Sequence, residues 1–207
     1  PEISQMCRFL NNMGAVICGM GTDHLMVQGV AGLHDSSFRV EGDRIVAGTY
    51  GAAAVAAGGE VLLRGICPSD LKVPLEEFQK AGAAVDADEK TARFGYAWEN
   101  VPFPFLLKQS VSRFSHGFAV ALHAFLATAR TSYIEEQVFE GRFATAKILE
   151  QMGAVIRTED QRAVIEGHYP LKGAAVNACD LRGGAALMVA ALGRGGGIHS
   201  SGNGPSH

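Results

Sequence analysis

Apolar positions recur along the chain with two different spacings. Runs with an apolar residue every three or four positions predict helices, and runs that alternate apolar with polar positions predict strands. The helices expected from this pattern cover 1–13, 44–57, 71–81, 117–128, 142–151 and 180–192. The expected strands cover 15–18, 25–30, 38–40, 60–66, 83–86, 91–96, 132–138, 154–157, 163–166 and 174–179. This mixture predicts an α/β (α+β) fold.

A glycine ends three of these helices, and a strand follows each of them. Gly14, Gly82 and Gly153 stand 68 and 71 residues apart, a spacing that indicates an internal repeat. The complete copy has the order strand, helix, strand, helix, strand, strand. The units expected from this order cover about 31–97, 98–168 and 169–192.

Arg142 breaks the repeat. Superposing the glycine-ended helices aligns it with Ile3 and Leu71, which are apolar. A charge at a position that sister helices keep apolar is costly unless a partner compensates it. One interpretation is an arginine that reaches solvent along its own aliphatic stem. The other is that Arg142 faces an anionic ligand, because a guanidinium group matches the geometry of carboxylate and phosphate.

Composition and charge narrow the function classes. The net charge of −3, with scattered basic residues, gives no indication of nucleic-acid binding. No apolar run reaches the eighteen residues of a membrane span and no leader opens the sequence, so a cytoplasmic protein is expected. The four cysteines and seven histidines show no metal-ligand spacing, and neither a metal nor a cofactor is expected. Cys7 and Cys18 are predicted to be small core residues, whereas Cys67 precedes Pro68 in a loop.

Six short motifs carry a resemblance to a known family. In chain order they resemble those of UDP-N-acetylglucosamine 1-carboxyvinyltransferase, an enolpyruvyl transferase. The motifs are PEI at 1–3, FLNNMGA at 9–15, GTD at 21–23, DRI with GT at 43–49, VFEGRF at 138–143 and DLR at 180–182. The resemblance covers nearly all of 1–97 and 119–192.

The resemblance implies two similar domains, each an inside-out α/β barrel of three repeated βαβαββ units. Residues 1–30 would be the tail of the first barrel domain and 31–192 most of the second, followed by an irregular tail at 193–207. The chain begins inside an element and without methionine, so it is expected to be a carboxy-terminal fragment with an incomplete barrel. Missing parts of the barrel are expected to leave apolar surface exposed.

The resemblance also implies a reaction. The family transfers the enolpyruvyl group of phosphoenolpyruvate to UDP-N-acetylglucosamine in peptidoglycan synthesis, through a tetrahedral intermediate that loses phosphate. This fragment is expected to be inactive alone. The related 5-enolpyruvylshikimate-3-phosphate synthase is the runner-up family. A further alternative is a non-catalytic remnant or anion-binding module of the same fold.

Site residues follow from the motifs residue by residue. Arg142 and Arg182 match the family's motif arginines, which would hold anionic groups of the substrates. Val138 matches a position that contacts the sugar nucleotide, and Phe139 lies beside it. His116 stands where the family has the aspartate of a Phe-Pro-Thr-Asp motif and is a weak candidate for the general base. An alternative interpretation of Arg182 is a helix-start arginine paired with Asp180.

Similarity to the family is lost abruptly near Trp98 and again after Leu192. Good matching between these two points suggests shifted reading frames or a damaged gene. The encoding DNA, read in its other two frames, would then recover the Phe-Pro-Thr-Asp motif near position 115.

Overall fold

The computed structural model describes residues 1–80, 83–96, 111–113, 132–135, 144–159, 162–166, 171–178, 180–193 and 199–200. The chain divides into two compact units, Pro1–Gly42 (unit 1) and Asp43–His207 (unit 2). Within the described ranges, no helix is long and apolar enough to cross a bilayer. The expected division of barrel domains at residue 30 stays a prediction.

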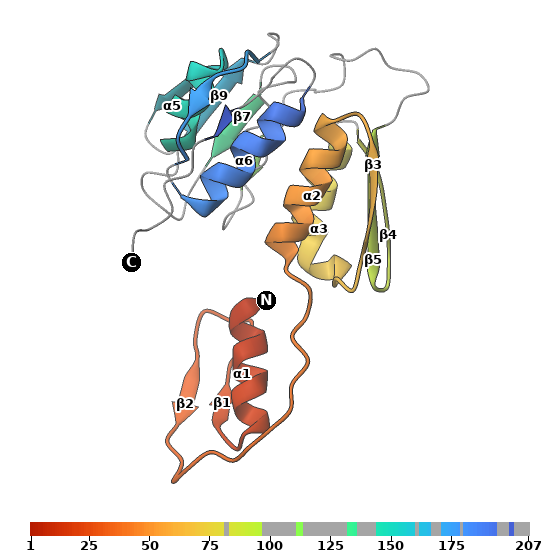
Figure 1. Ribbon diagram of the computed structural model, residues 1–207. Helices are drawn as coiled ribbons and strands as arrows, with labels where there is room; N and C mark the ends of the chain where they lie inside the picture. The colour runs from red at the N-terminus through yellow and green to blue at the C-terminus, as the bar shows by residue number, and fades with distance from the viewer. Residues whose placement is uncertain are drawn as a thin grey trace. The chain divides into compact units, whose positions relative to one another are not determined.

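Unit 1 is one helix beside a two-stranded antiparallel hairpin (Figure 1). Its elements are α1 (Glu2–Asn12), β1 (Val16–Cys18) and β2 (Met26–Gln28). After α1 the chain turns at Gly14, whose φ of 96° lies in the left-handed region that glycine tolerates. The backbone N–H of Ala15 donates to the carbonyl of Leu10 at 3.0 Å and closes the helix end.

Asn11 fastens α1 to the hairpin. Its side-chain amide donates to the carbonyl of Ile17 at 2.9 Å, and its oxygen accepts from the N–H of Ile17 at 2.9 Å. Ile17 is the buried residue of β1, and its neighbours point the other way because side chains alternate along a strand. Cys7 is buried as predicted. The prediction for Cys18 was wrong, because this residue lies on the outward face of β1 and is exposed.

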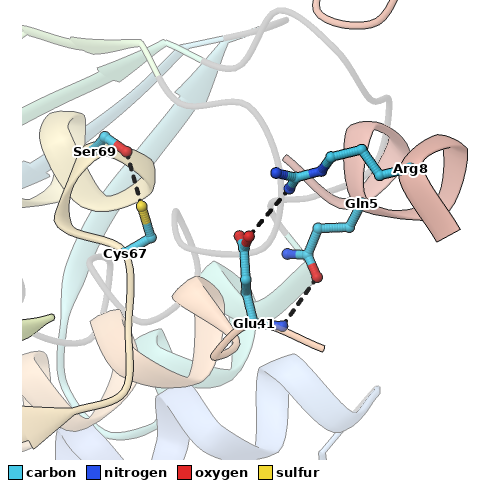
Figure 2. A network of polar contacts seen from close by, with 5 residues as sticks. All are labelled: Gln5, Arg8, Glu41, Cys67 and Ser69. Carbon is cyan, nitrogen blue, oxygen red and sulfur yellow. Dashed lines mark hydrogen bonds and ion pairs between the residues drawn. The ribbon is translucent and has the colours of Figure 1, made fainter. Parts of the chain in front are cut away.

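A linker that follows the hairpin returns along α1. The carboxylate of Glu41 accepts from Arg8 at 3.1 Å, and its backbone N–H donates to the side-chain oxygen of Gln5 at 3.1 Å (Figure 2). Phe38 packs against Phe9 with 5.6 Å between ring centroids. The strand expected at 38–40 was wrong: no strand pairs with this segment in the described part of the chain, and Phe38 packs on a helix instead.

Unit 2 contains the remaining elements. Its helices are α2 (Arg44–Ala56), η1 (Pro68–Leu71), α3 (Lys72–Lys80), α5 (Ala144–Gln151) and α6 (Leu181–Leu192). Its strands are β3 (Glu60–Arg64), β4 (Ala83–Asp88), β5 (Thr91–Tyr96), β6 (Val111–Arg113), β7 (Ser132–Glu135), β8 (Val155–Glu159), β9 (Arg162–Glu166), β10 (Ala175–Val176) and β11 (His199–Ser200). The helix expected at 117–128 lies outside the described residues.

The sheets of unit 2 repeat the same pairing. One sheet has the order β3-β5-β4, and another has the order β6-β7-β9-β8 with β6 parallel to β7. Val61 pairs with Phe94, and Ser132 pairs with Ile165, so the second pair lies 71 residues later on both strands. The strand pairs β4-β5 and β8-β9 keep the same 71-residue step. The repeat predicted from glycine spacing is therefore present in the strand register.

The core of the β3-β5-β4 sheet lies under two helices on the same face, α2 and α3 (Figure 1). Phe94 from β5 meets Phe78 from α3 edge to face, with ring centroids 5.2 Å apart, and both rings are fully buried. Small residues let α2 approach the sheet closely. The helix is not buried on all sides, however, because Val46 and Tyr50 are exposed.

Two helix ends match in detail. Gly153 after α5 has a φ of 90°, and the N–H of Ala154 donates to the carbonyl of Leu149 at 3.0 Å, as Ala15 does to Leu10. These contacts confirm the predicted roles of Gly14 and Gly153, whereas Gly82 lies outside the described residues. Within the segment expected to be irregular, β11 pairs in parallel with β10.

Candidate functional site

The start of α6 is the described part of the candidate site. Asp180 precedes the helix, and its carboxylate accepts from the backbone N–H of Gly183. This contact satisfies one of the free N–H groups at the start of a helix. Asp43 does the same for α2 through the N–H groups of Ile45 and Val46, at 2.7 and 3.1 Å. Both helices thus begin directly after these aspartates, at or next to the starts expected at 44 and 180.

Arg182 lies in the first turn of α6 and is exposed. Among the described residues it forms no ion pair with Asp180, whose carboxylate is directed to the helix backbone instead. The interpretation of Arg182 as the partner of Asp180 is therefore not supported. An exposed guanidinium beside the positive end of a helix favours an anionic group.

Leu181 stands next to Arg182 and is 90% exposed. A large apolar side chain this open, directly beside a cation, gives the first turn of α6 both an apolar and a charged contact. A single exposed leucine is common on protein surfaces and does not by itself indicate a ligand. Sequence reasoning did not single out Leu181, because an isolated leucine at a helix start resembles any core residue.

The other predicted site residues lie outside the described residues: His116, Val138, Phe139 and Arg142. In the sequence Arg142 stands two positions before α5, which begins at Ala144. Its counterparts in the repeat differ from each other, because Leu71 is fully buried and Ile3 is 60% exposed. The position that Arg142 occupies in the repeat is therefore buried in the second copy, at Leu71, and exposed in the first copy, at Ile3.

Two buried polar residues were missed by the sequence reasoning. Thr145 lies in the first turn of α5, and Glu77 lies on α3. Both are engaged in interactions within the structure. A single polar residue inside a helical pattern carries no signal of burial, so the sequence could not single them out. In the sequence Thr145 stands three residues after Arg142.

Cys67 sits in the loop that precedes η1, as predicted. Its thiol lies 3.0 Å from the hydroxyl of Ser69 and is half-buried (Figure 2). Ser69 and Cys67 share a single hydrogen bond in which either group can donate. Within the described residues, no group of three or more histidine, cysteine or acidic side chains is placed to hold a metal ion.

Comparison with known proteins identifies the family. The model of the EPSP synthase (3-phosphoshikimate 1-carboxyvinyltransferase) family matches residues 1–200. The chain therefore belongs to this family of enolpyruvyl transferases. Among solved structures, the enolpyruvyl transferase NikO from Streptomyces tendae has a TM-score of 0.79 at 22% identity, covering 98% of this chain and 48% of that one. An EPSP synthase from Acinetobacter baumannii has a TM-score of 0.65 at 19% identity, covering 82% of this chain and 41% of that one.

Curated relatives refine the resemblance. The UDP-N-acetylglucosamine 1-carboxyvinyltransferase of Hyphomonas neptunium is 39% identical over 198 residues, which cover 93% of this chain and 46% of the relative. The enzyme of the same name from Rhodopseudomonas palustris is 38% identical over 205 residues, covering 93% of this chain and 45% of the relative. The chain thus spans about half the length of the curated relatives it matches. The resemblance stated from the motifs is confirmed, and so is the fold class, an incomplete α/β fold of the enolpyruvyl transferase type.

Proposed function

We propose that this chain is the carboxy-terminal part of an enolpyruvyl transferase that acts on UDP-N-acetylglucosamine, and that it is inactive alone. The observation that carries the proposal is the 39% identity to the Hyphomonas neptunium enzyme over 93% of the chain. The reaction would move the enolpyruvyl group of phosphoenolpyruvate to a sugar hydroxyl and release phosphate. In a cell it would serve peptidoglycan synthesis in the cytoplasm.

The proposed roles of the residues follow the charges of the substrates. Phosphoenolpyruvate and a sugar nucleotide carry several negative charges, which fixed guanidinium groups stabilise best. Arg182 supports this role by its exposure at the start of α6. Arg142 would act with it, and Val138 and Phe139 would contact the sugar nucleotide. His116 would accept the proton of the reacting hydroxyl group.

Shikimate 3-phosphate is the alternative acceptor, because the matching family model is that of EPSP synthase. The sugar nucleotide is favoured because the curated relatives at 38 to 39% identity carry its name, whereas the EPSP synthase structure is 19% identical. A non-catalytic remnant of the fold would bind an anion without turning it over.

The test supplies the part of the Hyphomonas neptunium relative that this chain does not match and measures release of phosphate from phosphoenolpyruvate. Release is expected with UDP-N-acetylglucosamine and not with shikimate 3-phosphate, and neither part is expected to act alone. Release only with shikimate 3-phosphate would reassign the acceptor. A stable complex that binds phosphoenolpyruvate without release would identify a non-catalytic remnant.

His116→Ala in the same mixture tests the proposed base. Loss of turnover with phosphoenolpyruvate binding retained is expected, because removing a general base slows the proton transfer and not the binding. Unchanged turnover would remove His116 from the site.

A further inference from the structure

The outward face of the β1-β2 hairpin carries two sulfur-containing side chains opposite each other. Cys18 on β1 pairs with Met26 on β2 in antiparallel register. Side chains of directly paired residues point to the same face of a hairpin, with Cβ atoms about 4.5–5.5 Å apart. Ile17 is buried on the other face, so Cys18 and Met26 face water, and Met26 is 71% exposed. A thiol and a thioether therefore lie side by side at the surface of unit 1.

The other copies of the repeat have charged residues at the position of this cysteine. Cys18 stands four residues after the glycine that ends the helix before it, and the residues at the same distance in the other copies are Asp86 and Arg157. Both are exposed, and Asp86 pairs with Arg93 as Cys18 pairs with Met26. Free cysteine is among the residue types most often buried in proteins. Packing against a core therefore does not account for the exposed sulfur pair of unit 1.

The turn between the two strands brings a histidine to the same end of the hairpin. Gly19 follows Cys18 with a φ of 83°, and a Cβ there would collide with the backbone carbonyl oxygen of His24. The hydroxyl of Thr22 donates to the carbonyl oxygens of Gly19 and His24, at 2.8 and 2.9 Å, and closes the turn. His24 is thus held across the turn from Cys18. It stands two residues before Met26, the spacing at which side chains of an extended chain point to one side.

The imidazole of His24 is exposed and has an acidic neighbour on one side. Its Nε2 lies 3.8 Å from Oδ2 of Asp23. A carboxylate beside one ring nitrogen orients a metal-binding histidine and fixes its tautomer, so that the other nitrogen binds the ion. In His24 that other nitrogen is Nδ1. The end of the hairpin therefore carries a thiol, a thioether and an oriented imidazole, all accessible from water.

We propose that Cys18, His24 and Met26 bind a Cu(I) ion. Thiolate and thioether groups are soft ligands that select Cu(I), and imidazole also suits copper. Binding releases the proton of the Cys18 thiol to water, because the thiolate is the ligand. Among the described residues, no three histidine, cysteine or acidic side chains gather to hold a metal ion, and here a methionine supplies the third donor.

The donor set discriminates against Zn²⁺. Structural zinc sites use four ligands drawn from thiolate, imidazole and carboxylate groups. A thioether is too soft to replace one of them, so Met26 contributes to binding of Cu(I) and not of Zn²⁺. The proposed copper site belongs to unit 1, whereas the described part of the candidate functional site belongs to unit 2. The inference therefore does not depend on the proposed function and is tested without measuring turnover.

The experiment titrates the full chain with Cu(I) under anaerobic conditions, in competition with the coloured chelator bicinchoninate. Cys18→Ser is expected to weaken the tightest binding about a hundredfold or more, because a hydroxyl is a poor ligand for a soft cation. Met26→Leu and His24→Ala are each expected to weaken it about tenfold. Cys67→Ser and Met188→Leu are the matched controls and should leave the affinity unchanged, since Cys67 is half-buried in a loop of unit 2 and Met188 is 68% exposed on α6.

A second measurement uses the unsubstituted chain with its methionine methyl groups labelled with ¹³C. Addition of Ag(I), a soft cation like Cu(I), is expected to shift the methyl signal of Met26 and to leave that of Met188 in place. Circular dichroism first verifies that the variants fold, as expected for substitutions of exposed residues. The proposal is overturned if Cys18→Ser binds Cu(I) as tightly as Cys67→Ser, if Met26→Leu binds it as tightly as Met188→Leu, or if an equal concentration of Zn²⁺ displaces it.

Discussion

Gly51 and the ring of Phe94 meet so closely that there is no room for a side chain at position 51. A Cβ there would stand 2.8 Å from both Cγ and Cδ1 of the ring. The ring has little freedom to move, because it is fully buried and packs edge to face on Phe78. The close packing of α2 on its sheet therefore depends on the absence of a Cβ at Gly51.

Gly51→Ala is expected to lower the free energy of unfolding of unit 2 by about 1–3 kcal/mol. The overpacking cost outweighs the better helix propensity of alanine, which is worth up to about 1 kcal/mol. Urea denaturation followed by circular dichroism measures the change. Gly184→Ala in α6 is the matched control, because its Cβ would stand 3.4 Å from that of Ala178, an ordinary contact. Equal losses in both variants would show that the Phe94 contact is not responsible.

Leu71→Arg tests whether the repeat tolerates a charge at the position of Arg142. Leu71 is fully buried, so the variant is expected to lose about 3 kcal/mol or more of stability, from lost packing and a buried charge. Ile3→Arg makes the same substitution at the exposed counterpart and should change stability by less than about 0.5 kcal/mol. Thermal unfolding of both variants provides the comparison. A mild effect of Leu71→Arg would mean that the position accepts arginine without a ligand.

Asn11→Ala is expected to loosen unit 1. It removes two hydrogen bonds of 2.9 Å to the backbone of Ile17 and should cost about 1–3 kcal/mol locally. Faster hydrogen exchange at the amide of Ile17 reports this loss. Gln79→Ala removes the corresponding contact in unit 2, a single bond of 3.5 Å to Val85, and should have a smaller effect on its strand. If the two variants had equal effects, the short paired bonds would not be what holds β1.

Arg182→Ala is expected to reduce turnover of the reconstituted enzyme by about tenfold to a thousandfold, because a charge-assisted contact to an anionic group is lost. Arg182→Lys should recover part of the activity, since lysine keeps the charge and loses the planar fork. Stability should not change, because the side chain is exposed. Arg157→Ala removes an exposed arginine that pairs with Glu166 and should leave turnover unchanged. Steady-state kinetics that failed to separate the two alanine variants would remove Arg182 from the site.

The fold could be predicted from the sequence at positions where a residue type favours one local structure. Gly14 and Gly153 end helices because their backbone angles suit glycine, and Asp43 and Asp180 begin helices because their carboxylates satisfy free N–H groups. The short strand β11 has only two residues, too few to show any periodicity. Cys18 was placed in the core because its neighbours are apolar, but the strand that carries it has only one buried side.

The candidate site was harder to predict from the sequence, because it depends on where side chains point and on what buries them. The sequence could assign Arg182 to the start of a helix, but its lack of pairing with Asp180 depends on where that carboxylate points. The burial of Thr145 could not be predicted, because burial depends on the residues that pack around a side chain and not on the residue type alone. Resemblance to the family supplied the remaining candidates, and their geometry stays a prediction.

The 71-residue step in strand pairing constrains how this chain can change length. An internal deletion or tandem duplication of 71 residues would remove or add one repeat. The strands that remain, equivalent to β3 and β5, would keep equivalent pairing partners. A change that is one residue longer or shorter inside a strand would turn every following side chain to the opposite face. Viable length variants of this gene should therefore differ by whole modules or within the loops between strands.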